Sequence, residues 1–367
     1  MKKSVITLAL VLVIAMLAGC AGTPVVYYSD CTCPTGAHTE NVPAESTPVE
    51  TTAPAESQPI VTEGAVKTGV AILASAGESK PVTAEELGEA KYDASIVAVT
   101  VDEGGVITGC VIDSIGTSVT FDAAGVITSD LTAAIATKNE LGEAYGMKAY
   151  GGAAYEWYEQ AAALASYAVG KTVEELKTGA IDETGHAADA DLATTATIYL
   201  GGYVDAIENA VFNSQYLGAE IGDELKLAVI PSVSGNAADA ENAGLSQLDV
   251  NAVALTLRDG VITSAQIDSV QGKVNFDASG VITGGTDGVF ATKNLLGEQY
   301  GMVAWGGAIA EWNAQAASFA AYITGKTPAE VASIAVDETT KPTDADLVSS
   351  VTIKIGGFQA LIAKACG

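Results

Sequence analysis

The stretch EWYEQAAALASYAVGKT, residues 156–172, returns as EWNAQAASFAAYITGKT at residues 311–327. The two copies lie 155 residues apart, and the same offset aligns FDAAGVIT (121–128) with FDASGVIT (276–283). A period this long indicates two whole domains, because the units of a solenoid are much shorter. The sequence therefore predicts a tandem duplication in which both copies have the same fold.

The copies slip by one residue between two apolar runs, where AVTVDEGGVIT (98–108) faces ALTLRDGVIT (254–263). Loss of one residue within a strand would turn its buried face outward, whereas a turn tolerates the loss. The Asp-Gly pair at 259–260 is typical of a two-residue hairpin turn. We therefore predict an antiparallel pair of strands, 96–101 and 106–112 in the first copy.

Helices are expected later in each copy. Trp157, Ala161, Leu164 and Tyr167 recur at helical spacing, and GKTVEEL opens a second short helix. TATIYL then reads as a strand, and YVDAIENAV as a helix with an apolar face. Strands that come first and helices that come later predict an α+β fold, with a hairpin-rich sheet packed with helices in each copy.

The N-terminus reads as an export signal. Lys2 and Lys3 precede a short apolar run that ends in Leu-Ala-Gly-Cys at 17–20. This ending resembles the lipobox of bacterial lipoproteins, which implies acylation of Cys20 and anchoring to membrane lipid on the extracytoplasmic face of the cell membrane. The segment that follows is rich in Pro, Thr, Ser and Glu, and its composition predicts a disordered tether.

These signals divide the chain into five predicted parts. They are a signal peptide (1–20), a tether (21–66), the first repeat (67–211), a linker (212–224) and the second repeat (225–367).

Charge and residue inventory exclude several functions. The formal net charge is −28, with Arg258 as the single arginine, so nucleic acid is not an expected partner. Of the two histidines, His38 lies in the tether and His186 is replaced by Lys341 in the second copy, which disfavours a histidine-dependent hydrolase.

The loops DETGHAADAD (182–191) and DETTKPTDAD (337–346) are crowded with carboxylates, which either hold a divalent cation or form an acidic surface that caps the next element. We predict no metal site.

The end of each repeat is similar to a known family. GKTVEEL precedes Asp191-Leu-Ala-Thr-Thr-Ala-Thr197, and GKTPAEV precedes Asp346-Leu-Val-Ser-Ser-Val-Thr352. This order resembles the FMN-binding domain of bacterial membrane-associated and extracellular electron-transfer proteins. The resemblance implies a cofactor, FMN, attached through a phosphoester to Thr197, and less closely to Thr352, by a separate flavin transferase. The glycine of the family motif is Thr195 in the first copy and Ser350 in the second.

The same resemblance assigns further candidate cofactor-binding residues. Asp191 and Asp346 are the acidic residues of the motif, Tyr145 and Tyr300 are candidates to stack on the flavin ring, and Lys138 and Lys293 are the nearest candidates to a phosphate. If the motif segment is a strand, Thr197 and Thr352 lie on its solvent face.

Two functions follow from the sequence. The first is a flavin-carrying electron-transfer lipoprotein, with redox partners, in which the flavin is the reactive centre. The alternative is a non-catalytic cell-surface binding or structural lipoprotein whose twin domains hold a small ligand or a wall partner. Both describe a redox carrier or binding protein more readily than a hydrolase or transferase.

Overall fold

The computed structural model describes residues 64–367. The predicted signal peptide, its acylation residue Cys20, and residues 21–63 of the predicted tether lie outside the described residues, as do Cys31, Cys33 and His38. Val66, at the end of the predicted tether, is buried, and its amide donates to Ala219 O at 3.0 Å. No helix within residues 64–367 combines the length and the apolar character needed to cross a bilayer.

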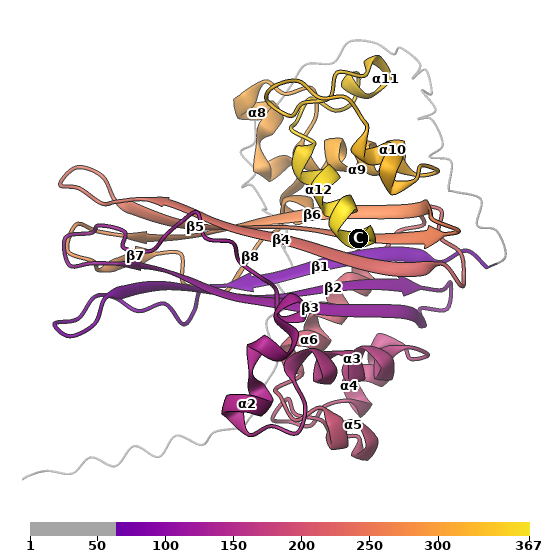
Figure 1. Ribbon diagram of the computed structural model, residues 1–367, viewed down its shortest axis with the longest axis horizontal. Coiled ribbons are helices and arrows are strands. Elements are labelled where there is room, and N and C mark those ends of the chain that lie inside the picture. Colours follow the sequence, from indigo (N-terminus) through magenta and orange to yellow (C-terminus); the bar gives the residue numbers. More distant parts are fainter. Residues whose placement is uncertain (1–63) are drawn as a thin grey trace, which may run out of the picture. The chain divides into compact units, whose positions relative to one another are not determined.

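The first copy has three long strands followed by a series of helices (Figure 1). The strands are β1 (Lys67–Ser75), β2 (Gly88–Val101) and β3 (Ile107–Phe121). The helices are α1 (Lys138–Leu141), the 3-10 helix η1 (Gly142–Tyr145), α2 (Met147–Gly151), α3 (Trp157–Ala168), α4 (Val173–Gly179), α5 (Ala190–Thr195) and α6 (Gly201–Phe212).

The second copy repeats this order and adds two short strands. Its strands are β4 (Glu224–Asn236), β5 (Gly244–Arg258), β6 (Val261–Phe276), β7 (Ile282–Gly284) and β8 (Val289–Phe290). Its helices are α7 (Lys293–Leu296), η2 (Gly297–Tyr300), α8 (Met302–Gly306), α9 (Trp312–Ile323), α10 (Pro328–Ala332), α11 (Ala345–Val348) and α12 (Gly356–Cys366).

The strands form two antiparallel sheets, with the orders β3-β2-β1-β8 and β4-β5-β6-β7. Each copy therefore supplies its own three-stranded meander. β8 belongs to the second copy by sequence but pairs with β1 of the first, through Ala74↔Phe290 and Ser75↔Val289. The second copy thus donates a short strand to the sheet of the first.

The two sheets pack face to face, with helices on both outer faces (Figure 1). Tyr92, Ile96, Val250 and Val270 contribute to the core between the sheets. A second core lies under α3 and α6, and a third lies under α9 and α12. The mixed α+β class predicted from sequence is confirmed.

The predicted hairpin is also confirmed. β2 and β3 pair in antiparallel register, and Val97, Val99 and Val101 lie together in the core under the helices. In the second copy, Asp259 and Gly260 both have positive φ, 51° and 78°, as a two-residue turn with left-handed central residues requires.

The predicted strand TATIYL is wrong, as is its counterpart in the second copy. Of its residues, 195–200, Thr195 ends helix α5 and residues 196–200 are irregular. Helix α5 forms because the Asp189 side chain accepts from the amides of Asp191 and Leu192. A run of β-branched residues favours a strand, but the amides of Thr197 and Ile198 donate to the side chain of Gln160 in place of a neighbouring strand.

Candidate functional site

The predicted attachment residue Thr197 lies on an irregular bend between α5 and α6, and it is exposed. Its backbone amide donates to Gln160 Oε1 at 2.7 Å, and the amide of Ile198 donates to the same oxygen at 3.1 Å. The Thr197 hydroxyl donates to this oxygen at 3.2 Å. Since Gln160 holds the bend and leaves the threonine accessible, the residues present fit a phosphoester at this hydroxyl.

The second copy repeats the arrangement around Thr352. The amides of Thr352 and Ile353 donate to Gln315 Oε1 at 2.8 and 3.2 Å. Thr352 is only half-exposed, so its hydroxyl is less accessible than that of Thr197. At the glycine position of the motif, Thr195 ends α5 and Ser350 lies in the turn after α11, and neither has the positive φ that would favour glycine.

The structure brings Lys138 and Tyr145 together. The Lys138 ammonium lies 5.2 Å from the ring centroid of Tyr145 and 5.3 Å from that of Trp157. Trp157 is buried, and its indole N–H donates to Tyr203 OH at 3.0 Å. A lysine therefore contacts the ring of Tyr145, the residue assigned to flavin stacking, through a cation–π interaction.

Lys293 and Tyr300 form the same cluster in the second copy. The Lys293 ammonium lies 5.1 Å from the Tyr300 ring centroid and 5.0 Å from that of Trp312. Burial lowers the pKa of Lys293, against the opposing charges of Asp249 and Asp268. Neither lysine is a free surface charge, since both are half-buried beside aromatic rings.

The predicted acidic residues do not join these clusters through any hydrogen bond recorded in residues 64–367. Asp191 and Asp346 are exposed in the first turns of α5 and α11, where their own amides donate to Asp189 and Asp344. No group of three or more His, Cys, Asp or Glu side chains suited to hold a metal ion occurs within the described part of the chain. Asp189 and Asp344 therefore cap the two helices, and Asp191 and Asp346 are acids of the first turns.

Two buried aspartates escaped the sequence-based assignment. Asp113 accepts from the amides of Ser114 and Asn139, and Asp268 accepts from those of Ser269 and Asn294. Burial raises the pKa of Asp113, and it raises the pKa of Asp268 to about 6. Their sequence signal is an Ile-Asp-Ser triplet inside a strand in both copies, where an acid interrupts an apolar run.

Sequence reasoning also missed a cleft of about 840 Å³ between the two copies. Its floor is formed by residues 71–73 of β1 and 265–267 of β6. Its walls are formed by residues 209–217, residues 289–295 and the outward face of α9. Volumes of this order hold small organic molecules in other proteins.

The cleft lining is uncharged. It combines small and apolar side chains with the polar side chains of Asn209, Asn213, Gln215, Gln266, Asn294 and Asn313 and a few hydroxyls. Three large apolar side chains at this cleft are exposed: Phe212, Val289 and Leu295. A neutral cleft with exposed apolar side chains is unusual in a chain with a net charge of −28.

Gln266 makes the floor of the cleft rigid. Its Oε1 accepts from the amide of Val70 at 2.6 Å, and its Nε2 donates to Asn213 O at 2.9 Å. The Asn213 side chain in turn donates to Val70 O at 3.3 Å. At this part of β1 no neighbouring strand pairs with Val70, and these side chains supply the hydrogen-bond partners of its amide and carbonyl groups. Because Gln266 and Val70 belong to different copies, the contacts join the two copies under the cleft.

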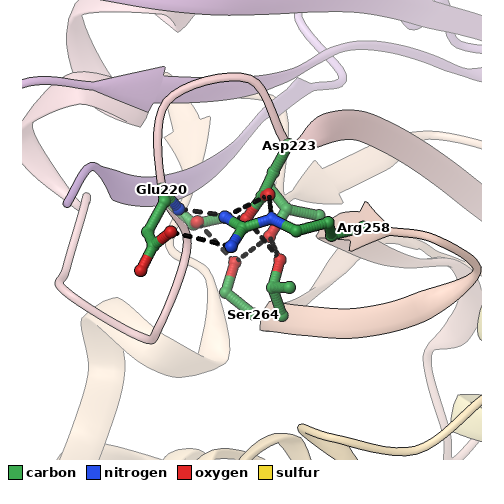
Figure 2. Close-up of polar contacts among 7 residues, drawn as sticks. Glu220, Asp223, Arg258 and Ser264 are labelled. Atoms are coloured by element: carbon green, nitrogen blue, oxygen red, sulfur yellow. Dashed lines mark hydrogen bonds and ion pairs between the residues drawn. The ribbon is translucent and has the colours of Figure 1, made fainter. Parts of the chain in front are cut away.

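Next to the floor, an ion-pair and hydroxyl network fastens the same junction (Figure 2). Arg258 contacts Glu220 at 2.7 Å and Asp223 at 2.6 Å. The Asp223 carboxylate is buried and also accepts from the Thr263 hydroxyl at 2.7 Å. Hydroxyl contacts then run through Thr256 and Ser264 to Thr68 of β1. The segment before β4, the β5–β6 hairpin and the first copy are thereby linked.

An ion pair crosses the groove that corresponds to the cleft by duplication. Lys364 of α12, the counterpart of Asn209, donates to Val229 O at 2.6 Å and contacts Glu140 at 2.8 Å. Glu140 is the counterpart of Leu295. Burial would raise the pKa of Glu140, but Lys364 and the Thr137 amide together lower it. We call the Lys364–Glu140 pair the plug.

Comparison of the chain with known protein families, with curated proteins and with solved structures finds no match. The function is therefore inferred from the geometry of the described residues.

Proposed function

We propose that this chain is an extracytoplasmic lipoprotein, acylated at Cys20, that binds one small uncharged organic molecule in the cleft between its two repeats. It is a non-catalytic binding protein in this proposal. The observation that carries it is the uncharged cleft of about 840 Å³, with amide groups on its walls and exposed apolar side chains.

The lining supports an uncharged ligand. Amides and hydroxyls at the cleft would fix the orientation of a bound molecule through hydrogen bonds, whereas an ionic ligand would lose hydration without gaining an opposite charge in the cleft. The exposed side chains of Phe212, Val289 and Leu295 would lose contact with water when a ligand binds. This burial of apolar surface favours association. The plug in the other groove supports a single site per chain.

Binding of Nile red, a neutral dye whose emission reports an apolar environment, tests the proposal. We expect saturable binding with one dye per chain. Ala317→Trp on α9 places an indole in the cleft and should weaken binding by about tenfold or more, which corresponds to roughly 1.4 kcal/mol.

The matched control is Ala162→Trp. Ala162 is the counterpart of Ala317 on α3, and both alanines are exposed. This variant should bind the dye as the parent chain does. Equal binding by the parent and both variants would place the dye outside the cleft and contradict the proposal.

A second candidate function is flavin-dependent electron transfer, favoured by the accessible Thr197 hydroxyl on its Gln160-held bend. When bound, FMN would supply the redox chemistry. Thr197 would hold the phosphate, and Lys138, which the sequence assigns to the phosphate, would balance its charge.

Co-expression with a flavin transferase, followed by denaturation and absorption spectroscopy, tests this candidate. We expect flavin absorbance that stays with the unfolded chain and disappears in Thr197→Ala, but remains in the matched control Thr352→Ala. A colourless parent chain would rule out covalent flavin and leave the cleft proposal unaffected.

A further inference from the structure

Helix α8 and the turn after it carry exposed apolar side chains. Trp305 is 90 % exposed, Ile309 57 % and Val303 48 %. Residues 299–310 contain no charged side chain, in a protein with 45 acidic residues. We call residues 302–309 the apolar tip.

The apolar tip is held in one conformation. Gly301 and Gly307 flank α8 with left-handed φ angles of 79° and 61°. The Trp305 ring lies on Gly301, because a Cβ atom there would come within 2.3 Å of the indole Cδ1. The Glu311 carboxylate accepts from the amides of Met302 and Val303 at 2.8 and 3.0 Å, so its charge is directed at the backbone of the tip.

The fold does not require these apolar side chains. The corresponding helix α2 has the same flanking left-handed glycines, and the carboxylate of Glu156 accepts from the backbone in the same way. In α2, however, Lys148 stands where α8 has Val303, and Tyr150 stands where α8 has Trp305. The packing of the apolar tip therefore does not require its exposed apolar side chains.

We propose that the apolar tip contacts the interface of a zwitterionic lipid bilayer, with Trp305 at the level of the headgroups. An indole combines a large apolar ring with one N–H donor, and this combination suits the boundary between headgroups and hydrocarbon. Val303 and Ile309 add aliphatic surface to that contact. Because the chain has a net charge of −28, anionic headgroups repel it, which selects a zwitterionic surface.

Vesicle binding tests this contact with the chain from Gln58 onward, which lacks Cys20 and contains every described helix and strand. Trp157 and Trp312 are buried, so a change in tryptophan emission on binding belongs to Trp305. With phosphatidylcholine vesicles we expect a blue shift of the emission and quenching by brominated lipid. Trp305→Ala should lower the partition coefficient by about tenfold, and phosphatidylglycerol vesicles should bind less of the parent chain.

Two variants separate this contact from a general loss of structure. Val303→Lys copies the residue that the first repeat tolerates at this place, and it should fold normally but bind vesicles more weakly. The matched control Tyr150→Ala alters the other tip and should bind as the parent does.

Three results would overturn the inference: no vesicle binding, equal partition of the parent and Trp305→Ala, or association of the chain into dimers through Trp305 in place of vesicle binding, as seen by sedimentation. Dye binding in the cleft is independent of each of them, since the cleft lining does not include the apolar tip.

Discussion

The two grooves between the repeats occupy equivalent places in the duplication but differ in content. One is an open, uncharged cleft of about 840 Å³, and the other contains the plug. At three positions an uncharged residue of the cleft lining has a charged counterpart: Asn209 against Lys364, Leu295 against Glu140, and Ala314 against Glu159. Duplication therefore supplied two equivalent sites, and a few side-chain changes leave one of them open.

The largest expected effect comes from transplanting the plug into the cleft. The double variant Asn209→Lys with Leu295→Glu should form the ion pair there and weaken Nile red binding by at least about tenfold, because the pair occupies the space and an uncharged dye cannot replace its interactions. A fluorescence titration measures the change. Unaltered binding would show that these positions do not control access.

The reverse exchange is the matching control. Lys364→Asn with Glu140→Leu removes the plug and should raise the dye stoichiometry from one to two per chain. A stoichiometry that stays at one would mean that the backbone, and not the plug, closes this groove.

The next effect concerns Asp268, which lies under the open cleft beside Asn294. Burial raises its pKa to about 6, against ~3.9 in an unfolded chain. Between about pH 4 and about pH 6 the folded chain keeps a proton that the unfolded chain has released, so stability falls as the pH rises through this window and then levels off.

Asp268→Asn should remove that part of the pH dependence, roughly 3 kcal/mol across the window. Urea unfolding of the parent and the variant, at several pH values from about 4 to about 7, measures it as a difference between the two curves. The matched variant is Asp113→Asn, whose pKa is raised in the same direction. Parallel curves for parent and Asp268→Asn would contradict the assignment.

A smaller loss is expected at the junction below the cleft. Asp223→Ala leaves the Thr263 hydroxyl and the Glu220 amide without their acceptor, and it should lower the free energy of unfolding by about 2 kcal/mol. Glu241→Ala, at an exposed loop carboxylate of the same repeat, serves as the control and should change stability little. Equal losses in both variants would show that the network in Figure 2 does not fasten the repeats.

The smallest effect is expected from Glu140→Gln. The Glu140 side chain caps the amide of Thr137 and also pairs with Lys364. Glutamine keeps the acceptor for Thr137 but loses the charge, and a partly exposed ion pair contributes at most about 1 kcal/mol. Thermal unfolding at low and high salt checks this, since added salt should reduce the difference between the parent and the variant.

Much of the fold could be predicted from local patterns. The 155-residue repeat, the Asp-Gly turn before β6 and the apolar spacing of α3 each depend on residues close together in sequence. The strand predicted at residues 195–200 is wrong because two side chains determine the backbone there. The Asp189 side chain caps helix α5, and Gln160, which is distant in sequence, accepts a hydrogen bond from the amide of Thr197. The Glu-Trp-x-x-Gln pattern that contains this acceptor occurs in both copies, but as a short polar signal in an apolar helix it does not reveal its partner.

For the candidate sites, the sequence assigned the lysines, the tyrosines and the motif aspartates of each copy to one cofactor site. In the structure Lys138 contacts Tyr145 and Lys293 contacts Tyr300, whereas Asp191 and Asp346 are exposed in the first turns of α5 and α11. The sequence did not indicate the cleft.

The sequence by itself determined the duplication, the excess of negative charge, the hairpins and most helices, because periodicity and turn chemistry act over a few residues. Only the tertiary structure decided that one groove is an uncharged cleft and the other is crossed by an ion pair, that Asp268 is buried, and that Gln266 completes the edge of β1. The physical reason is that these features join segments up to 196 residues apart. Their free energies depend on the packing of both copies together, which no local pattern encodes.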